Sequence, residues 1–234
     1  MNNLYSLLET KIRGVSGFTP MEQLFALLCL TISSNNIQGN ILEVGSWCGL
    51  SSIALGLGSK STKTSTVYCV DLFPNKDDWY QNEDKSFSFE TKVNGKELKS
   101  YDVQTVWEET FKKKMLPVYQ NEKSLEVIFN KNISNAGLSD IIVPFKGELK
   151  DFLKHHDSEK FNLVFLDGHH SYENVSLEIK YLETKINSGG WLCFDDAFTV
   201  YDGVDKAIRE NILNSKKFRN FTQLTRKMFV AQKL

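Results

Sequence analysis

Short apolar runs alternate with helix-length segments along most of this chain. Five runs are predominantly apolar instead of alternating with polar positions, at 41–44, 66–70, 141–145, 161–166 and 191–194. Runs of this length and character are typical of strands buried on both faces of a parallel sheet. Helix candidates follow them at 51–57, 125–135, 148–156, 172–187 and 203–214. This order predicts an α/β fold built on a doubly wound, mostly parallel sheet.

The two ends of the chain predict different structures. Thr19-Pro20-Met21-Glu22 is typical of a helix start with Thr19 as the N-cap, so residues 1–39 are predicted to form an N-terminal helical segment. The runs 221–225 and 228–231, joined by Arg226-Lys227, predict a terminal antiparallel hairpin. With this hairpin the sheet has seven strands, and residues 1–234 form one domain.

Residues 74–123 interrupt the alternation. The segment is polar and mixed in charge, yet rich in aromatic side chains, which predicts an ordered insertion. Apolar positions between Val103 and Met115 fall at helical spacing. This helix is expected either to pack on the domain or a partner subunit, or to form a lid or a wall of an acceptor site.

Composition and charge narrow the classes of partner. The 234 residues carry 28 Lys and Arg against 29 Asp and Glu, so no overall basic field favours nucleic acid or an anionic membrane. The longest apolar run, about 24–30, is far shorter than the roughly 20 residues that span a bilayer. A secretory signal pattern is not visible, so we expect a cytoplasmic protein.

The first predicted strand ends in a glycine loop. Gly45 and Gly49 allow a tight turn and a close backbone approach, and Ser51 can cap the following helix, whose free N–H groups favour a carboxylate or phosphate. The second strand ends in Asp71, placed to accept hydrogen bonds from the two hydroxyls of a ribose. A nicotinamide cofactor also fits this spacing.

Two details of the loop favour another cofactor. The glycines form Gly45-x-x-x-Gly49 instead of G-x-G-x-x-G, and Glu43 precedes them by two residues. This pattern resembles the class I S-adenosylmethionine-dependent methyltransferases, over about residues 40–234 without the insertion. The resemblance implies a loop along the methionine part of the cofactor, Asp71 at its ribose, Gly147 near its adenine, and Glu43 orienting the loop. The implied cofactor-binding residues are Glu43, Gly45, Ser46, Gly49, Ser51, Asp71 and Gly147.

Carboxylates follow the next two strands. Asp167 comes after the fourth strand, and Asp195-Asp196 come after the fifth. The two strands are neighbours in the doubly wound order, so the three side chains can converge beside the cofactor. Converging carboxylates repel one another unless a cation neutralises them, and oxygen ligands favour a hard cation such as Mg²⁺.

The stretch Asp167-Gly168-His169-His170-Ser171-Tyr172-Glu173 and the aspartate pair resemble the metal-dependent sugar O-methyltransferases of the macrocin O-methyltransferase-like family. The resemblance implies a metal bound by Asp167, Asp195 and Asp196, with His170 or His169 as the base. Alternatively, the two histidines cap the next helix, and Asp195-Asp196 form an N-cap pair without a metal.

These patterns predict an S-adenosylmethionine-dependent O-methyltransferase, assisted by Mg²⁺, that acts on a hydroxyl of a small molecule or glycosyl acceptor. Three alternatives stay open: a metal-independent methyltransferase acting on another nucleophile, a nicotinamide-dependent oxidoreductase, and a noncatalytic binding module. If Trp79, Trp107 and their neighbours form a contact patch, the protein would assemble as a homo-oligomer.

Overall fold

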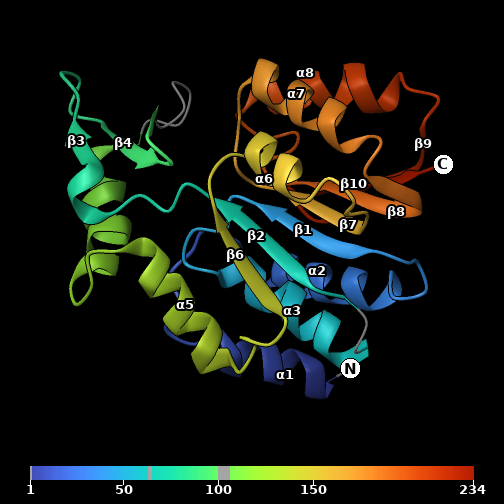
Figure 1. The fold of residues 1–234 in the computed structure, drawn as a ribbon, viewed down its shortest axis with the longest axis horizontal. Helices are drawn as coiled ribbons and strands as arrows, with labels where there is room; N and C mark the ends of the chain where they lie inside the picture. The colour runs from blue at the N-terminus through green and yellow to red at the C-terminus, as the bar shows by residue number, and fades with distance from the viewer. Residues whose placement is uncertain (1, 63–64, 100–105) are drawn as a thin grey trace.

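A seven-stranded sheet forms the centre of the computed structural model, which describes residues 2–62, 65–99 and 106–234 (Figure 1). The strands lie in the order β6-β2-β1-β7-β8-β10-β9, with β10 antiparallel to both of its neighbours and the other pairs parallel. Their bounds are Asn40–Val44 (β1), Val67–Asp71 (β2), Ile142–Lys146 (β6), Phe161–Leu166 (β7), Ile186–Phe194 (β8), Phe218–Gln223 (β9) and Phe229–Lys233 (β10).

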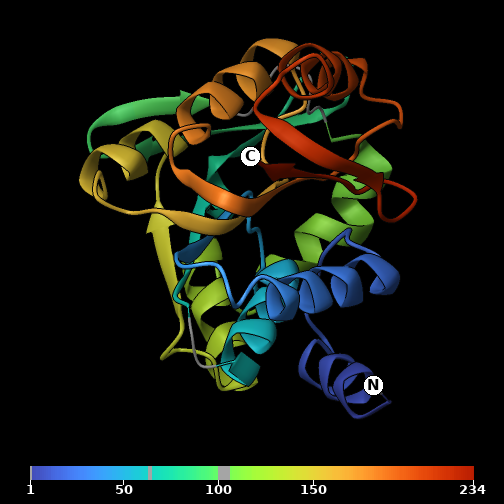
Figure 2. The ribbon, with the colours of Figure 1, turned by 90° about the vertical axis from the view of Figure 1, so that its right-hand side faces the viewer.

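Helices cover both faces of this sheet (Figures 1 and 2). One layer contains α1 (Asn2–Lys11), α2 (Met21–Ser33), α3 (Leu50–Thr62) and α5 (Leu125–Ala136). The other contains α6 (Leu149–His155), α7 (Tyr172–Leu182), α8 (Asp202–Ile208) and the helical turn Arg209–Leu213. A separate hydrophobic core fills the space on each side, because the strands carry apolar side chains on both faces. The predicted doubly wound α/β fold is confirmed.

The order in which strands are added to the sheet reverses at β1. This strand pairs with β2 on one side and with β7 on the other, so the later strands extend outward from both of its edges. Ligands of open α/β sheets bind at such a switch point, beyond the carboxyl ends of the strands. All the loops that carry candidate residues follow these strand ends.

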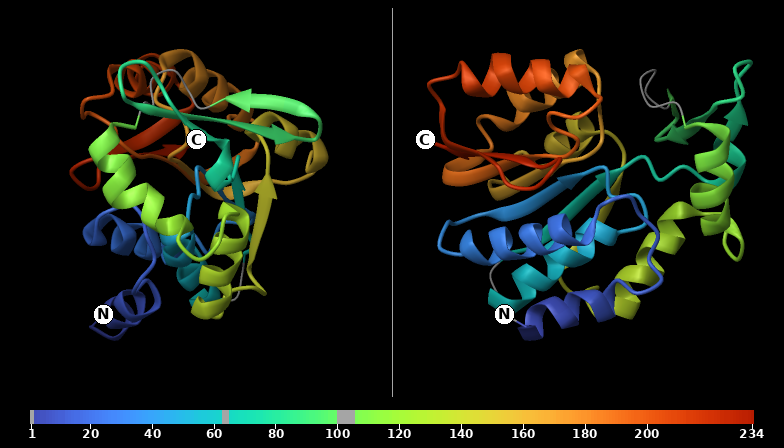
Figure 3. Two further views of the ribbon diagram at one scale, coloured as in Figure 1. Left: turned by 90° about the vertical axis from the view of Figure 1, so that its left-hand side faces the viewer. Right: turned by 180° about the vertical axis from the view of Figure 1, so that it is seen from behind.

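The insertion forms a small unit of its own beyond the ends of β1 and β2 (Figure 3). It contains an antiparallel sheet of β3 (Trp79–Gln81), β4 (Phe87–Val93) and β5 (Lys96–Lys99), preceded by the turn Lys76–Asp78. Short helical segments follow at Glu108–Thr110 (α4), Phe111–Met115 and Leu116–Tyr119.

Aromatic packing holds this unit together, as its composition predicts. The rings of Phe87 and Phe111 stack with their centroids 3.9 Å apart, and Trp79 contacts Phe89 and Phe111. The predicted helix between Val103 and Met115 is only partly confirmed. Residues 103–105 lie outside the described part of the chain, and Val106 pairs with Phe87 as an isolated bridge, so the helical turns begin at Glu108.

Two predicted boundaries are wrong. The helix predicted over 172–187 ends at Leu182. Ile186 instead begins β8, where it pairs with Phe161 of β7. The register of this pairing shifts near Gly189, whose φ is +83°, and the strand continues beyond the shift to Phe194. Helix α2 has Pro20 as its N-cap, so the residue predicted for that position, Thr19, lies one residue farther out. The terminal hairpin of β9 and β10 is confirmed. No helix within the described ranges is long and apolar enough to span a membrane.

Candidate functional site

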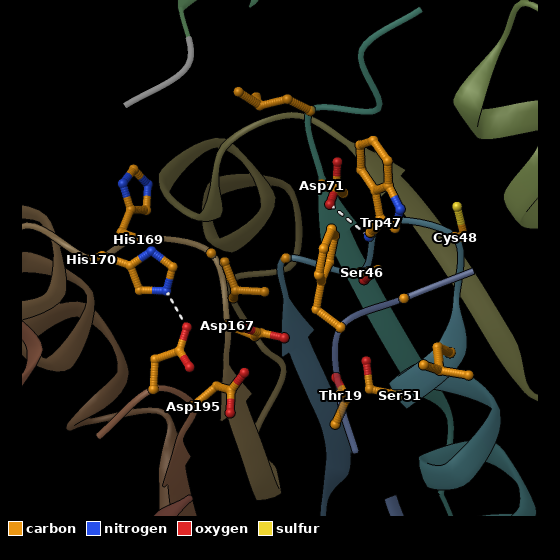
Figure 4. A pocket seen from close by; sticks show the side chains of 18 of the residues that line it. Thr19, Ser46, Trp47, Cys48, Ser51, Asp71, Asp167, His169, His170 and Asp195 are labelled. Atoms are coloured by element: carbon orange, nitrogen blue, oxygen red, sulfur yellow. Dashed lines mark hydrogen bonds and ion pairs between the residues drawn. The ribbon is translucent and has the colours of Figure 1, made fainter. Parts of the chain in front are cut away.

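A cavity of about 600 Å³ opens at the carboxyl ends of the parallel strands (Figure 4). The loops after β1, β2, β6, β7 and β8 line it. The rest of the lining comes from residues 16–20 before α2, from the aromatic face of the insertion, and from Glu178, Tyr201, Arg226 and Lys227. The cavity therefore lies at the switch point of the sheet, where the predicted site residues were expected to meet.

The glycine loop after β1 has a backbone that only glycine accommodates well. Gly45 has a φ of +90°, and a Cβ atom there would lie 2.4 Å from the carbonyl oxygen of Asp167. Gly49 has a φ of +88° and donates its amide to the carbonyl of Ser46, which closes the turn before α3. Gly45, Ser46 and Ser51 line the cavity.

Glu43 lies beneath this loop and is fully buried. The hydroxyl of Ser52, in the first turn of α3, donates a hydrogen bond to its Oε2 atom. Burial raises the pKa of Glu43, although the nearby hydroxyls oppose this shift. The contact ties the end of β1 to the start of α3.

Asp71 occupies the end of β2 on the wall of the cavity. Its Oδ2 accepts the amide of Trp47 at 2.9 Å, and its Oδ1 accepts the amide of Phe73 at 2.7 Å. Burial raises the pKa of Asp71, while these amides work against the shift. Gly147 donates its amide to the Asp71 carbonyl at 2.9 Å, which brings the end of β6 to the same wall.

The second group of candidate residues lines the opposite part of the cavity. Asp167, His170 and Asp196 each offer one ligand atom, and these atoms lie within 4.8 Å of one another. The His170 Nε2 atom is 3.2 Å from the Asp196 Oδ2 atom, and its ring stacks on Tyr201. His170 faces the aspartates in Figure 4, whereas the His169 ring points away from them.

Asp195 was predicted to be a metal ligand, but it is not part of the group that the structure brings together. It is buried, and both carboxylate oxygens have protein partners: Gln23 Nε2 lies 2.5 Å from Oδ1, and Lys227 Nζ lies 2.8 Å from Oδ2. The structure therefore offers His170 in place of Asp195 as the third member of the cluster. His170 lies near Asp167 because both are in the loop after β7, and Asp195 lies near it because β8 is the neighbouring strand.

The charges of this cluster are unequal. Burial raises the pKa of Asp167 well above its ordinary value, and Asp195 adds to the shift. Burial also acts on Asp196, but the hydrogen bond with His170 and the charge of Lys227 outweigh it and lower the pKa of Asp196. Of Asp167 and Asp196, Asp196 is therefore the one that ionises more readily.

Neither structural alternative for these residues holds. Ser171 caps α7, its hydroxyl accepting the amide of Asn174, so the two histidines do not cap that helix. Tyr201 is the N-cap of α8, so Asp195 and Asp196 do not form an N-cap pair. The histidines and aspartates project from irregular loops at the strand ends instead.

The sequence analysis missed a buried acid in the cavity wall. Glu178 on α7 is 5% exposed, and its Oε1 atom lies 3.6 Å from His169 Nε2. Burial raises the pKa of Glu178 to about 8 and lowers the pKa of His169 to about 3. At neutral pH both side chains are therefore mostly uncharged, with the carboxyl of Glu178 protonated and the ring of His169 neutral. The periodicity of α7 predicts burial at this position, but nothing local indicates its partner.

Glu178→Gln is expected to stabilise the protein increasingly as pH rises. Between the ordinary pKa of 4.5 and the folded value of about 8, the unfolded chain loses the proton that the folded chain keeps, so wild-type stability falls. Glutamine does not titrate. We expect a gain of about 2–4 kcal/mol at pH 8 and little at pH 5 by urea denaturation. Glu173→Gln, on the exposed face of α7, is the control. An equal effect at both pH values would contradict the prediction.

Comparison with known proteins assigns the chain to a family. A family model described as a methyltransferase domain matches residues 42–197, from β1 to the loop after β8. This chain belongs to that family. The match spans the glycine loop, Asp71 and the three aspartates Asp167, Asp195 and Asp196, which we call the aspartate cluster. It confirms the resemblance to class I S-adenosylmethionine-dependent methyltransferases. It also decides against the nicotinamide-dependent oxidoreductase. No curated protein matches the chain.

Solved structures of methyltransferases have the same fold. The O-methyltransferase NovP is 19% identical with a TM-score of 0.63, covering 91% of this chain and 80% of its own. CalS11, a TDP-rhamnose 3'-O-methyltransferase of calicheamicin biosynthesis, is 12% identical with a TM-score of 0.58, covering 99% and 91%. An O-methyltransferase from Bacillus cereus in complex with SAH is 16% identical with a TM-score of 0.55, covering 100% and 91%.

Proposed function

We propose that this methyltransferase transfers the methyl group of S-adenosylmethionine to a hydroxyl of a small-molecule or glycosyl acceptor, with the assistance of Mg²⁺. The observation that carries the proposal is the content of one cavity. The glycine loop and Asp71 line one part of it, and Asp167, His170 and Asp196 line another. A donor bound along the loop would thus lie next to groups that can hold and deprotonate a hydroxyl.

The residues of the first part fit the cofactor. Ser46 lines the cavity, and its buried hydroxyl lies beside the carboxylate of Glu43, which is outside the lining. The backbone of the loop at Gly45 and Ser46 and the carboxylate of Asp71 therefore give this part of the cavity polar groups for a ligand. S-adenosylmethionine supplies an electrophilic methyl group when bound. Asp71 would accept its ribose hydroxyls, since each carboxylate oxygen keeps a free lone pair after bonding one amide.

The residues of the second part fit a divalent cation. Asp167 and Asp196 offer the carboxylate oxygens that Mg²⁺ prefers, and His170 adds an imidazole nitrogen, a ligand more usual for transition metals, within the same small volume. When bound, Mg²⁺ would supply the Lewis acidity that lowers the pKa of the acceptor hydroxyl. Of the two histidines, His169 lines the cavity but lies outside the cluster, so it is the one that would serve as the base where His170 holds the cation.

The insertion supports an acceptor with an apolar face. Trp79, Phe89, Trp107 and Met115 line the cavity on the side beyond the strands. Aromatic side chains bury the flat apolar face of a ring while leaving its hydroxyls free for the polar side of the cavity. The glycosyl class is further supported by CalS11, whose substrate is a TDP-linked sugar. We therefore propose that the described residues of the insertion that line the cavity form the acceptor wall.

A metal-independent methyltransferase is the second candidate. The ammonium group of Lys227 lies between Asp195 and Asp196, where it can neutralise the carboxylates in place of a metal. In that case His169 or His170 would deprotonate the acceptor without the help of a metal.

Two measurements test the proposal. Calorimetric titration with S-adenosylhomocysteine (SAH) should give one-site binding at micromolar Kd or tighter, and NADH should not bind.

In the second measurement, methyl-labelled S-adenosylmethionine is offered with nucleotide sugars and phenols, and with the matching amines. We expect label on hydroxyl acceptors, a loss of rate by about 100-fold in EDTA, and recovery with Mg²⁺. A folded protein that does not bind SAH would overturn the proposal. Full activity in EDTA would favour the metal-independent candidate, and labelled amines alone would exclude O-methylation.

A further inference from the structure

Lys227 reaches the aspartate cluster from the turn between β9 and β10. Its side chain is only 12% exposed, and its Nζ atom lies 2.8 Å from Asp195 Oδ2 and 3.2 Å from Asp196 Oδ1. The hairpin was predicted from the sequence, but its turn lysine had no assigned role. In the structure this lysine is placed where three carboxylates meet.

The turn is held against the cluster by contacts other than the ion pairs. The amide of Ala197, the residue after Asp196, donates to the Lys227 carbonyl at 2.9 Å. Thr225 in the same turn donates its hydroxyl to Gln23 Oε1 at 3.2 Å, and the amide group of Gln23 donates to Asp195. Because the backbone is fixed on both sides, the ammonium group is positioned before any ligand arrives.

The lysine satisfies a charge requirement of the cluster. Asp167, Asp195 and Asp196 repel one another in a partly desolvated site, and a positive charge must balance them. The ammonium group of Lys227 supplies this charge, because it lies within ion-pair distance of Asp195 and Asp196. A divalent cation bound by Asp196 would lie close to this ammonium group, and the two positive charges would repel each other.

We propose that Lys227 is the resident cation of the aspartate cluster and competes with a divalent metal for Asp196. The inference rests on the metal site of the proposed function. It predicts that metal binds weakly to the wild-type protein, because binding must displace the ammonium group or overcome its repulsion. Removing that charge while keeping the volume of the side chain should leave Asp196 free for the metal.

The test compares Mn²⁺ binding by wild-type protein, Lys227→Met and Lys227→Arg, measured by electron paramagnetic resonance and calorimetry. We expect Lys227→Met to bind Mn²⁺ on the order of 10- to 100-fold more tightly than wild type, the usual range for coupling between two sites. Lys227→Arg keeps the charge and should bind as weakly as wild type. Lys217→Met, which removes an ammonium group paired with Glu183 far from the cluster, should have no effect.

Stability gives a second readout. Without metal, Lys227→Met should melt at a lower temperature than wild type, and Mn²⁺ should restore more stability to it than to wild type. If Lys227→Met does not fold, Lys227→Gln removes the same charge and undergoes both measurements.

Equal Mn²⁺ affinity of the folded variant and wild type would overturn the inference. SAH binding, measured on the same samples, distinguishes this failure from failure of the proposed function, in which SAH would not bind at all.

Discussion

We expect Asp71→Ala to bind SAH about 100-fold more weakly than wild type, a loss of about 2.7 kcal/mol. The substitution removes the carboxylate that would accept the ribose hydroxyls. It also leaves the amides of Trp47 and Phe73 without their acceptor, so the glycine loop and the end of β2 lose the contact that joins them. Both effects act on the same half of the cavity.

The measurement is calorimetric titration with SAH, accompanied by a thermal melt. Asp71→Asn keeps one oxygen acceptor and the size of the side chain, so its loss should be intermediate. Asp77→Ala removes an exposed aspartate paired with Lys123 in the insertion and should bind like wild type. Wild-type affinity in Asp71→Ala would remove this residue from the cofactor site.

Gly45→Ala should abolish SAH binding and destabilise the fold by about 3 kcal/mol or more. Two costs add at this position. A φ of +90° is strained for alanine, and the new Cβ would lie 2.4 Å from the Asp167 carbonyl oxygen, so the backbone must move. That movement would separate the ends of β1 and β7, and with them the glycine loop and the aspartate cluster.

Gly95→Ala is the matched control for this prediction. Gly95 lies in the turn between β4 and β5 with a φ of +80°, and no atom would come within 4 Å of its Cβ. It therefore has the backbone strain without the collision, and should cost only about 1 kcal/mol. If both variants melt and bind SAH alike, the close approach of Gly45 to Asp167 does not matter.

The Gly45→Ala expectation follows from one feature of the architecture. Gly45 and Asp167 directly follow the neighbouring parallel strands β1 and β7, and their backbones lie in close contact. A change in the glycine loop is therefore transmitted to the first residue of the aspartate cluster. The rate of methyl transfer should be sensitive to the loop even where cofactor binding survives.

The central sheet could be predicted from the sequence because strands buried on both faces are apolar at nearly every position. The run 161–166 is the clearest case, since β7 has those bounds and is buried along its whole length. The glycine loop was equally visible, because its positive φ angles and close contacts require glycine at Gly45 and Gly49. The start of β8 was not, since the strand crosses Gly189 and Gly190, which locally resemble a turn.

The sequence by itself therefore determined the fold, the glycine loop and the strand ends that carry Asp71, Asp167 and Asp196. Only the tertiary structure decided what surrounds them. Gln23 and Lys227 reach Asp195 from opposite ends of the chain, and Glu178 meets His169 from the next helix. Burial and backbone conformation leave a local pattern of residue types, whereas the pairing of a buried charge depends on which distant segments the sheet topology brings together.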